Sequence, residues 1–284
     1  MDKIVKALIF DDAVSICVIK STSIVNKAIK LFNLSPVAAA ALGRTLTITT
    51  YMSSELKNKH DNLTITVDGG GEIGKIVTSC DSSLNVRGYV SNPQIDLNLR
   101  GGKLDVGGAV GNNGKITVVK DTGLKEPYIG STNLVSGEIA ADFTKYYFES
   151  EQTPVAISLG VLIGKNRKCL SAGGLIIKPL PNCPGLVIEK LEKLIADFAD
   201  LSSQLKNIEA IDFLNEKFSD YSLKILETKT PKYKCKCNIS KIKSLIYSIP
   251  KDEIIEILDK DKKIEIICHF CNKSYLLYRD DFKF

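Results

Sequence analysis

Cys235-Lys236-Cys237 and Cys268-His269-Phe270-Cys271 form a C-x-C pair followed, one short domain's length later, by a C-x-x-C pair. Zn²⁺ prefers soft thiolate ligands in a tetrahedron, and two short pairs brought together by a folded loop supply that geometry. The segment of residues 231–284 is short enough that an apolar core alone would leave it marginally stable. The spacing therefore predicts a small C-terminal zinc domain over 231–284, with these ligands: Cys235, Cys237, Cys268 and Cys271.

Two other interpretations of these thiols have to be weighed. A C-x-x-C motif also occurs in thioredoxin-like redox sites, but there it opens a helix after a strand in a βαβ unit, and no such pattern surrounds Cys268. Zinc is therefore favoured over a metal-free redox pair. Spacing alone favours a passive structural zinc over one with a switching role.

His269 could replace one cysteine as a ligand, but four sulfurs already complete the shell, so we expect it to face solvent or lie beside the ligands.

The region before the cysteines has helical periodicity. Within residues 185–227, apolar residues recur every three or four positions with Glu and Lys between them, which predicts amphipathic helices. The apolar positions are Val187, Leu191, Leu194, Ile195, Phe198, Leu201 and Leu205. Prolines at 179, 181 and 184 interrupt any regular element before this region. We therefore expect a helical linker over residues 181–230.

Residues 1–180 mix strand and helix signals, which predicts an α+β N-terminal domain with a mostly antiparallel sheet and packed helices. The cleanest strand alternation is Leu63-Thr64-Ile65-Thr66-Val67, and Ser35-Pro36 supplies a preferred helix N-cap and first helical residue. We expect strands within 4–20, helices over 21–33 and from 35 towards 57, a sheet over 61–119, a helix over 136–151 and strands within 154–179.

Composition narrows the class of protein. The 284 residues are 44% hydrophobic and 25% charged, which is ordinary for a globular protein and unlike a disordered chain. A net charge of +5 is far from that of a dedicated nucleic-acid binder. The N-terminus lacks the apolar region of a signal peptide, and the longest uncharged apolar stretch, residues 154–164, is too short to span a bilayer. We expect a cytoplasmic protein without a membrane or nucleic-acid partner.

The remaining thiols have no mutual metal-ligand spacing. We expect Cys17, Cys80 and Cys169 to pack in apolar surroundings, and Cys183, which lies between prolines, to be more exposed. His60 lies in a polar stretch and is expected on a surface loop. With two histidines and no nucleophile near either, a histidine-based hydrolase has little support, and we expect no catalytic residue.

Gly69, Gly71 and Gly74 satisfy the G-x-G-x-x-G pattern of dinucleotide-binding loops. Such a loop must be followed by a helix whose N-terminus meets the pyrophosphate, whereas strand-like residues 75–78 follow here. The glycines are therefore interpreted as a hairpin turn.

Several motifs along the chain occur together in one known family. They are Ala41-Leu42-Gly43-Arg44, Asp68-Gly69-Gly70-Gly71 with Ile73-Gly74, Gly137-Glu138-Ile139-Ala140 with Asp142, Tyr146-Tyr147, Ser150-Glu151-Gln152 with Pro154, Ala172-Gly173-Gly174 and the C-terminal cysteine pairs. From about residue 40 to the end, the chain resembles the 33 kDa chaperonin family of redox-regulated heat-shock proteins. It departs from that pattern at Lys178, where related chains are expected to have glutamine, and in its four additional cysteines.

The resemblance implies an ATP-independent chaperone that is a zinc-bound, inactive monomer when reduced. On oxidation, such proteins form disulfides within the neighbouring pairs, here Cys235–Cys237 and Cys268–Cys271, release zinc, lose linker structure and bind unfolding proteins, often as dimers. Zinc ligation and redox sensing thus fall on these four residues, and no catalytic residue comes with the resemblance.

Two other functions remain as alternatives. A nucleic-acid-binding zinc module would need a basic face with interleaved aromatic residues, and the C-terminal segment offers Tyr233, Tyr247, Phe270, Tyr275 and Tyr278. A nucleotide-dependent enzyme would need the glycine-rich loop. The resemblance favours the chaperone over both.

Overall fold

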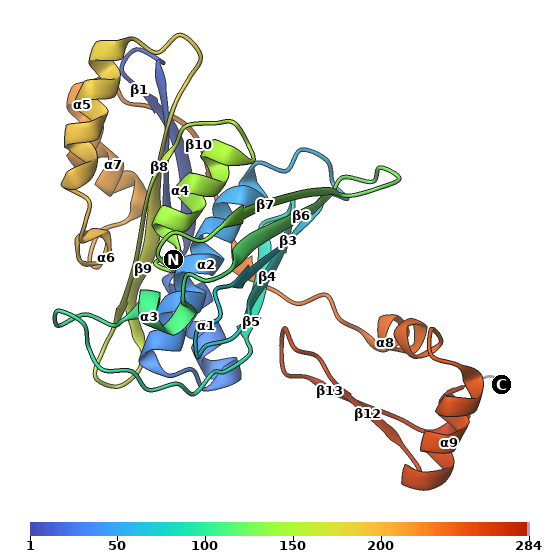
Figure 1. Ribbon diagram of the computed structural model, residues 1–284. Helices are drawn as coiled ribbons and strands as arrows, with labels where there is room; N and C mark the ends of the chain where they lie inside the picture. The colour runs from blue at the N-terminus through green and yellow to red at the C-terminus, as the bar shows by residue number, and fades with distance from the viewer. Residues whose placement is uncertain (283–284) are drawn as a thin grey trace. The chain divides into compact units, whose positions relative to one another are not determined.

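The computed structural model describes residues 1–282 and separates into two compact units, Met1–Tyr233 and the chain from Lys234 onward. The first unit, the body, contains two sheets and most of the helices (Figure 1). The mixed α+β class expected from the sequence is confirmed. Among the described residues, no helix is long and apolar enough to cross a membrane.

The body strands form two sheets, called sheet A and sheet B. Sheet A is antiparallel with the order β10-β1-β2-β9-β8. Its strands are β1 (Lys3–Ile9), β2 (Val14–Lys20), β8 (Ala156–Ile163), β9 (Cys169–Pro179) and β10 (Lys224–Lys229). Sheet B has the order β11-β5-β4-β3-β6-β7, in which β11 runs parallel to β5 and the other pairs are antiparallel. Its strands are β3 (Asn62–Asp68), β4 (Ile76–Asp81), β5 (Asn85–Val90), β6 (Lys115–Asp121), β7 (Tyr128–Asn133) and β11 (Lys232–Tyr233).

Helix α2 (Pro36–Ser54) lies between the two sheets and is buried along most of its length (Figure 1). It begins as the sequence predicts, because the Ser35 side chain accepts a hydrogen bond from the Ala38 amide. Its buried threonines do not leave polar atoms unpaired. The hydroxyls of Thr45 and Thr50, for example, donate to the carbonyls four residues earlier at 2.9 and 2.8 Å. Satisfied in this way, α2 can occupy the centre of the core.

The other helices of the body cover the sheets. They are α1 (Thr22–Phe32), α3 (Val106–Val110), α4 (Ala140–Glu149), α5 (Gly185–Ala196), α6 (Leu201–Gln204), α7 (Ala210–Phe218) and the short 3₁₀ turn η1 (Ser219–Tyr221). Helices α5, α6 and α7, here called the outer helices, pack on the face of sheet A that points away from α2 (Figure 1).

Sheet A has an apolar core on each face. Successive residues of a strand point to opposite faces. In β1, Ile4 belongs to the core around α2, whereas Val5 belongs to the core under the outer helices. The same division occurs in β2, where Ile19 faces α2 and Val18 faces the outer helices. Leu191, Phe198, Phe213 and Phe218 close the outer core from the helix side. Residues expected as a linker therefore pack directly on the body.

One secondary-structure prediction is wrong. Helices were expected through residue 227, but α7 ends at Phe218, Ser222 has a left-handed φ of 55°, and Lys224–Lys229 forms β10. This segment pairs with the edge of β1, where Ile4 lies opposite Lys229. The ladder with a distant strand overrides the local helical pattern, and the sequence pattern did not reveal it.

The glycine-rich segment joins β3 to β4 as the predicted hairpin. Its glycines lie against the backbone around Val110: a Cβ on Gly71 would lie 2.3 Å from the carbonyl oxygen of Ala109, and one on Gly69 would lie 2.3 Å from that of Gly111. The loop needs glycine because another backbone segment lies against it.

The second unit contains α8 (Ile239–Ile246), α9 (Lys251–Asp261), β12 (Ile264–Ile267), β13 (Ser274–Leu277) and the 3₁₀ turn η2 (Arg279–Asp281). The two strands form an antiparallel hairpin. Its buried core is small and consists of Ile242, Ile246, Ile254, Leu258, Tyr275, Leu277 and Phe282. Such a core provides little stabilisation by itself.

Gly71→Ala should lower the free energy of unfolding of the body by about 1–3 kcal/mol, because its methyl group collides with the Ala109–Val110 backbone. Urea unfolding followed by circular dichroism measures this. Gly185→Ala is the matched control, since nothing lies within 4 Å of the position that its Cβ would take, and it should change stability by less than about 0.5 kcal/mol. Equal effects of the two substitutions would contradict the steric role of Gly71.

Candidate metal centre

The four cysteines of the C-x-C and C-x-x-C pairs come from two segments of the second unit. Cys235 and Cys237 lie in the irregular segment between β11 and α8, and Cys268 and Cys271 lie in the turn between β12 and β13. All four side chains are half-buried. The fold of the second unit thus brings together two cysteine pairs that are more than thirty residues apart in the chain.

The hairpin turn holds its two cysteines by backbone hydrogen bonds. The amides of Cys271 and Asn272 both donate to the carbonyl oxygen of Cys268, at 3.2 and 2.8 Å, and the Cys268 amide donates to the carbonyl of Lys273 at 3.0 Å. Asn272 adopts a left-handed φ of 57°, a conformation that asparagine tolerates well. The turn therefore places both thiols in the same cluster as Cys235 and Cys237.

The distances between the sulfurs fit a tetrahedral metal ion. The Sγ atoms of Cys235 and Cys268 are 3.7 Å apart, those of Cys237 and Cys271 are 3.4 Å apart, and all four lie within 4.8 Å of one another. A Zn–S bond of about 2.3 Å in a regular tetrahedron places sulfurs about 3.8 Å apart. All four thiols are free of disulfides. The group can therefore hold one metal ion with small adjustments.

Tyr275 supports this cluster from β13. Its hydroxyl donates to Sγ of Cys237 at 3.1 Å, and its ring is part of the small core of the unit. Partial burial acts to raise the pKa of Cys237, but the hydrogen bond from Tyr275 and those from neighbouring thiols outweigh it and lower the pKa to about 7. Partial burial raises the pKa of Cys235 and of Cys271, which share their protons with neighbouring sulfurs. The cluster is thus part thiolate near neutral pH, and a bound metal would displace the remaining protons.

Sequence reasoning treated Tyr275 only as one of several aromatic residues. A signal was available, because Tyr275 and Leu277 alternate with exposed residues in β13 and so point into the core, close to the C-x-x-C turn. The sequence could not predict that this hydroxyl contacts Cys237, which lies 38 positions earlier in the chain.

The other candidate residues lie apart from the cluster. His269 is exposed and does not belong to the metal-ligating group found among the described residues, and His60 is exposed on its loop. Cys17, Cys80 and Cys169 are buried as predicted. Burial raises the pKa of each of these thiols, to about 12 for Cys80 and Cys169, so they stay protonated at neutral pH. Cys183 is half-buried beside the core under the outer helices.

Comparison with known proteins agrees with this architecture. A model of the family described as Hsp33 protein matches residues 2–277. The chain belongs to the Hsp33 family. A 33 kDa chaperonin of Alkaliphilus metalliredigens is 42% identical over 275 residues, which are 96% of this chain and 94% of that protein. One from Caldanaerobacter subterraneus is 43% identical over 283 residues, covering 98% of this chain and 96% of the relative.

A solved structure supports the same assignment. The crystal structure of the 33 kDa chaperonin of Thermotoga maritima matches with a TM-score of 0.90 at 34% identity, covering 99% of this chain and 96% of that one. Membership of the Hsp33 family, whose curated relatives are named chaperonins, supports a chaperone function for this chain.

Reduced protein is expected to bind one zinc ion per chain, and three substitutions should rank the contributions of the site. Cys237→Ser removes a ligand and should weaken binding most. Tyr275→Phe removes the hydrogen bond that the Tyr275 hydroxyl donates to the sulfur of Cys237. Loss of such a hydrogen bond to a metal ligand typically lowers the affinity for the metal about 10–100-fold. His269→Ala should change affinity little. Competition with a chromogenic chelator measures all three. Loss of binding on removal of His269 alone would contradict an all-sulfur site.

Proposed function

We propose that this chain is an ATP-independent holdase chaperone whose binding of unfolding proteins is switched on by oxidation of a zinc-bound four-cysteine centre. The observation that carries the proposal is the covering of an apolar sheet face by the segment that immediately precedes the cysteines. Family membership supports the chaperone activity. The arrangement of the chain supports the way in which it is regulated.

The proposed resident metal is zinc, held by Cys235, Cys237, Cys268 and Cys271. Four thiolates with sulfur separations of 3.4 and 3.7 Å between the closest pairs suit a closed tetrahedral site, which is the structural type of zinc site. When bound, zinc would hold the thiolates together and neutralise part of their charge. Tyr275 would orient Cys237 through its hydrogen bond, and no residue is assigned a catalytic role.

The second unit depends on this metal in the proposed mechanism. Its core consists of only a few side chains, whereas structural zinc contributes roughly 10–16 kcal/mol of apparent binding free energy in small domains. That contribution is comparable with the whole stability of a typical domain, about 5–15 kcal/mol. Removing zinc should therefore unfold the unit rather than loosen it.

The proposed switch uses the ligands as redox sensors. Each neighbouring pair of thiolates, Cys235 with Cys237 and Cys268 with Cys271, would give two electrons to one peroxide molecule and form one disulfide, while the peroxide takes up two protons from solvent and becomes two molecules of water. A disulfide sulfur is a poor zinc ligand, so zinc leaves. The reverse reaction needs a thiol reductant and zinc. Such a switch suits the reducing cytoplasm, where free thiols are the resting state.

The outer helices are the proposed link between this switch and client binding. They bury Leu191, Phe198 and Phe213 against the outer face of sheet A, and β10 and β11 connect them to the cysteines. The chain runs from β11 directly to Cys235, so unfolding of the second unit would leave the pairing of β10 with β1 and the short pairing of β11 with β5 to hold this end of the segment. Detached outer helices would expose apolar residues of both the helices and sheet A, which is the surface that unfolding clients bind.

The three functional parts proposed from the sequence remain residues 1–180, 181–230 and 231–284. In the reduced state the linker is packed on the body, since its helices share a core with sheet A. It is a separate part only in the sense that its helices could leave while β10 and the other strands remain in the sheets. We propose a monomer in the reduced state and a dimer after oxidation, through the apolar surface that is uncovered.

Peroxide with mild heat should release zinc, increase binding of a hydrophobic dye and start suppression of client aggregation, all without ATP, because the three events share one cause. Zinc release, dye fluorescence and light scattering of an unfolding client can be followed on one oxidation time course. Thiol reductant with zinc should reverse all three. Full activity in reduced, zinc-loaded protein, unchanged by oxidation, would reduce the metal centre to a passive support and contradict the regulation.

Gly160→Val should activate the chaperone partly without oxidation. A Cβ on Gly160 would lie 2.7 Å from both the Cβ and the amide nitrogen of Ser202, so a larger residue pushes α6 away from β8. We expect increased dye binding and partial holdase activity while zinc remains bound. Gly185→Val, at a position with nothing within 4 Å, is the control and should resemble the natural chain. Unchanged dye binding in Gly160→Val would show that docking of the outer helices does not control the surface.

A further inference from the structure

The outer edge of β8 has no strand beside it among the described residues, because β8 is the last strand of sheet A. In an edge strand, alternate residues direct their amide and carbonyl groups outward, where nothing in the sheet pairs with them. Natural proteins usually protect such an edge with lysine, proline or a bulge. The strand at the opposite edge, β10, carries Lys224, Glu227 and Lys229, whereas the β8 sequence Ala-Ile-Ser-Leu-Gly-Val-Leu-Ile has neither charge nor proline, and its register with β9 is irregular at its C-terminal end, between Leu162 and Ile163.

A recess lies along this edge. One cavity of about 510 Å³ follows β8 from Leu159 to its C-terminal end, and a second of about 640 Å³ follows it from Val155 to Leu159. The two share lining residues, among them Arg44 and Lys103, so they are parts of one slot. The slot lies between the layer of α2 and α4 and the layer of the α5–α6 turn. It occupies the place of the next strand of the sheet.

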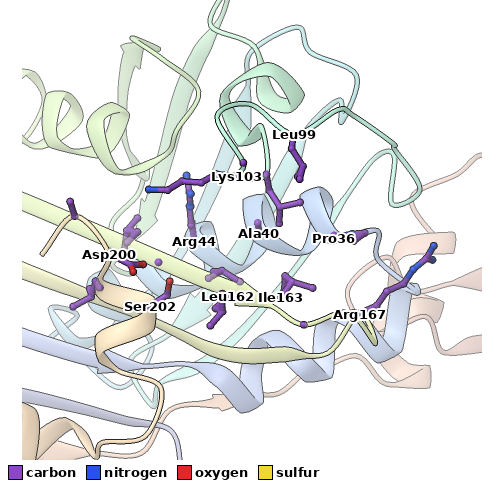
Figure 2. A pocket seen from close by; sticks show the side chains of 18 of the residues that line it. Pro36, Ala40, Arg44, Leu99, Lys103, Leu162, Ile163, Arg167, Asp200 and Ser202 are labelled. Carbon is purple, nitrogen blue, oxygen red and sulfur yellow. The ribbon is translucent and has the colours of Figure 1, made fainter.

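The two walls of the slot differ chemically. The wall from α2 and the adjoining loop carries Arg44 and Lys103, and Arg167 lies at the far end (Figure 2). Lys165 also lines the slot. The other wall is mainly apolar and includes Phe198, Leu201 and one carboxylate, Asp200. Arg44 is paired with Glu138, but its Nε is buried without a hydrogen-bond partner. No ion pair is found for Lys103, Lys165 or Arg167 within the described part of the chain, so the slot has unbalanced positive charge.

We propose that this slot binds an extended acidic peptide segment, which adds as a strand to the edge of β8. Backbone pairing with β8 would supply affinity, as in other cases of strand addition. Because side chains of a strand alternate between faces, carboxylates at every second position would meet the cationic wall while apolar residues between them meet the wall of the α5–α6 turn. The preferred segment therefore alternates acidic and apolar residues.

This site differs from the surface beneath the outer helices. The slot is open while those helices are docked, because they form one of its walls. Binding there would need neither zinc release nor oxidation. Its failure would leave the proposed redox-switched function untouched, since it is tested in the reduced state and without a holdase assay.

Binding can be tested with the full-length, reduced, zinc-loaded protein and a fluorescent peptide of alternating valine and glutamate, as long as the eight residues of β8. The comparison peptides are alternating valine and lysine, and a block peptide with the glutamates all at one end. Fluorescence anisotropy gives the dissociation constants. The alternating acidic peptide should bind about tenfold more tightly than either of the others, as expected for a few exposed charge pairs combined. Equal affinities would overturn the proposal.

A charge-reversed variant, Lys103→Glu with Lys165→Glu, should lose about tenfold in affinity for the acidic peptide and gain for the lysine peptide. Lys30→Glu with Lys125→Glu makes the same change of charge at exposed positions away from the slot and is the control. Equal losses in both variants would mean that net charge alone attracts the peptide, which would overturn the site.

Residue-resolved amide exchange decides whether a strand is added. Peptide binding should slow exchange at alternate residues of β8, since only the outward-facing amides gain partners. Peptide binding without protection in β8 would overturn strand addition. If the reduced chain sediments as a dimer whose β8 amides are already protected, the edge belongs to a second copy and the proposal is likewise overturned.

Discussion

Sheet A is apolar on both faces and therefore needs a covering layer on each side. Burying apolar surface stabilises by about 25 cal/mol per Å², so a bare face of this kind is costly in water. Helix α2 covers the inner face and is itself enclosed by sheet B, which makes that layer permanent. The outer face is covered mainly by the outer helices, which follow β9 in the chain. This unequal covering is the constraint on which the proposed function depends.

The two layers differ in how they are held. Helix α2 is tied into the core from all sides, and its buried threonine hydroxyls are satisfied by hydrogen bonds within the helix and to neighbours, such as the 2.7 Å contact between the hydroxyls of Thr49 and Thr78. The outer helices contact one face of one sheet and still leave apolar side chains such as Leu186 exposed. A layer with fewer partners opens at a lower free energy than the rest of the fold. In the proposed mechanism, the body would lose these helices and keep its sheets.

In the proposed mechanism, the cysteine cluster would provide the chemical signal for such a change. Metal ligation and reaction with oxidants would both use the thiolate form of these cysteines. Tyr275 favours this form at Cys237 and also belongs to the small core, so the metal centre and the folding of the second unit depend on the same side chain. Three of the four additional cysteines do not interfere as long as the body is folded, since burial keeps Cys17, Cys80 and Cys169 protonated.

Features that depend on neighbouring residues could be predicted from the sequence: the strand alternation of 63–67, the capped start of α2 at Ser35, the glycine hairpin, and the pairs of cysteines whose spacing predicts a metal centre. Three features became visible in the folded chain: residues 224–229 form a strand, the Tyr275 hydroxyl contacts Cys237, and the outer helices cover sheet A. The slot beside β8 likewise arises from helices and loops far apart in the chain. Hydrogen-bond ladders and shared cores join residues that are far apart in the sequence. A local sequence pattern does not identify the distant residues with which it will pair or pack.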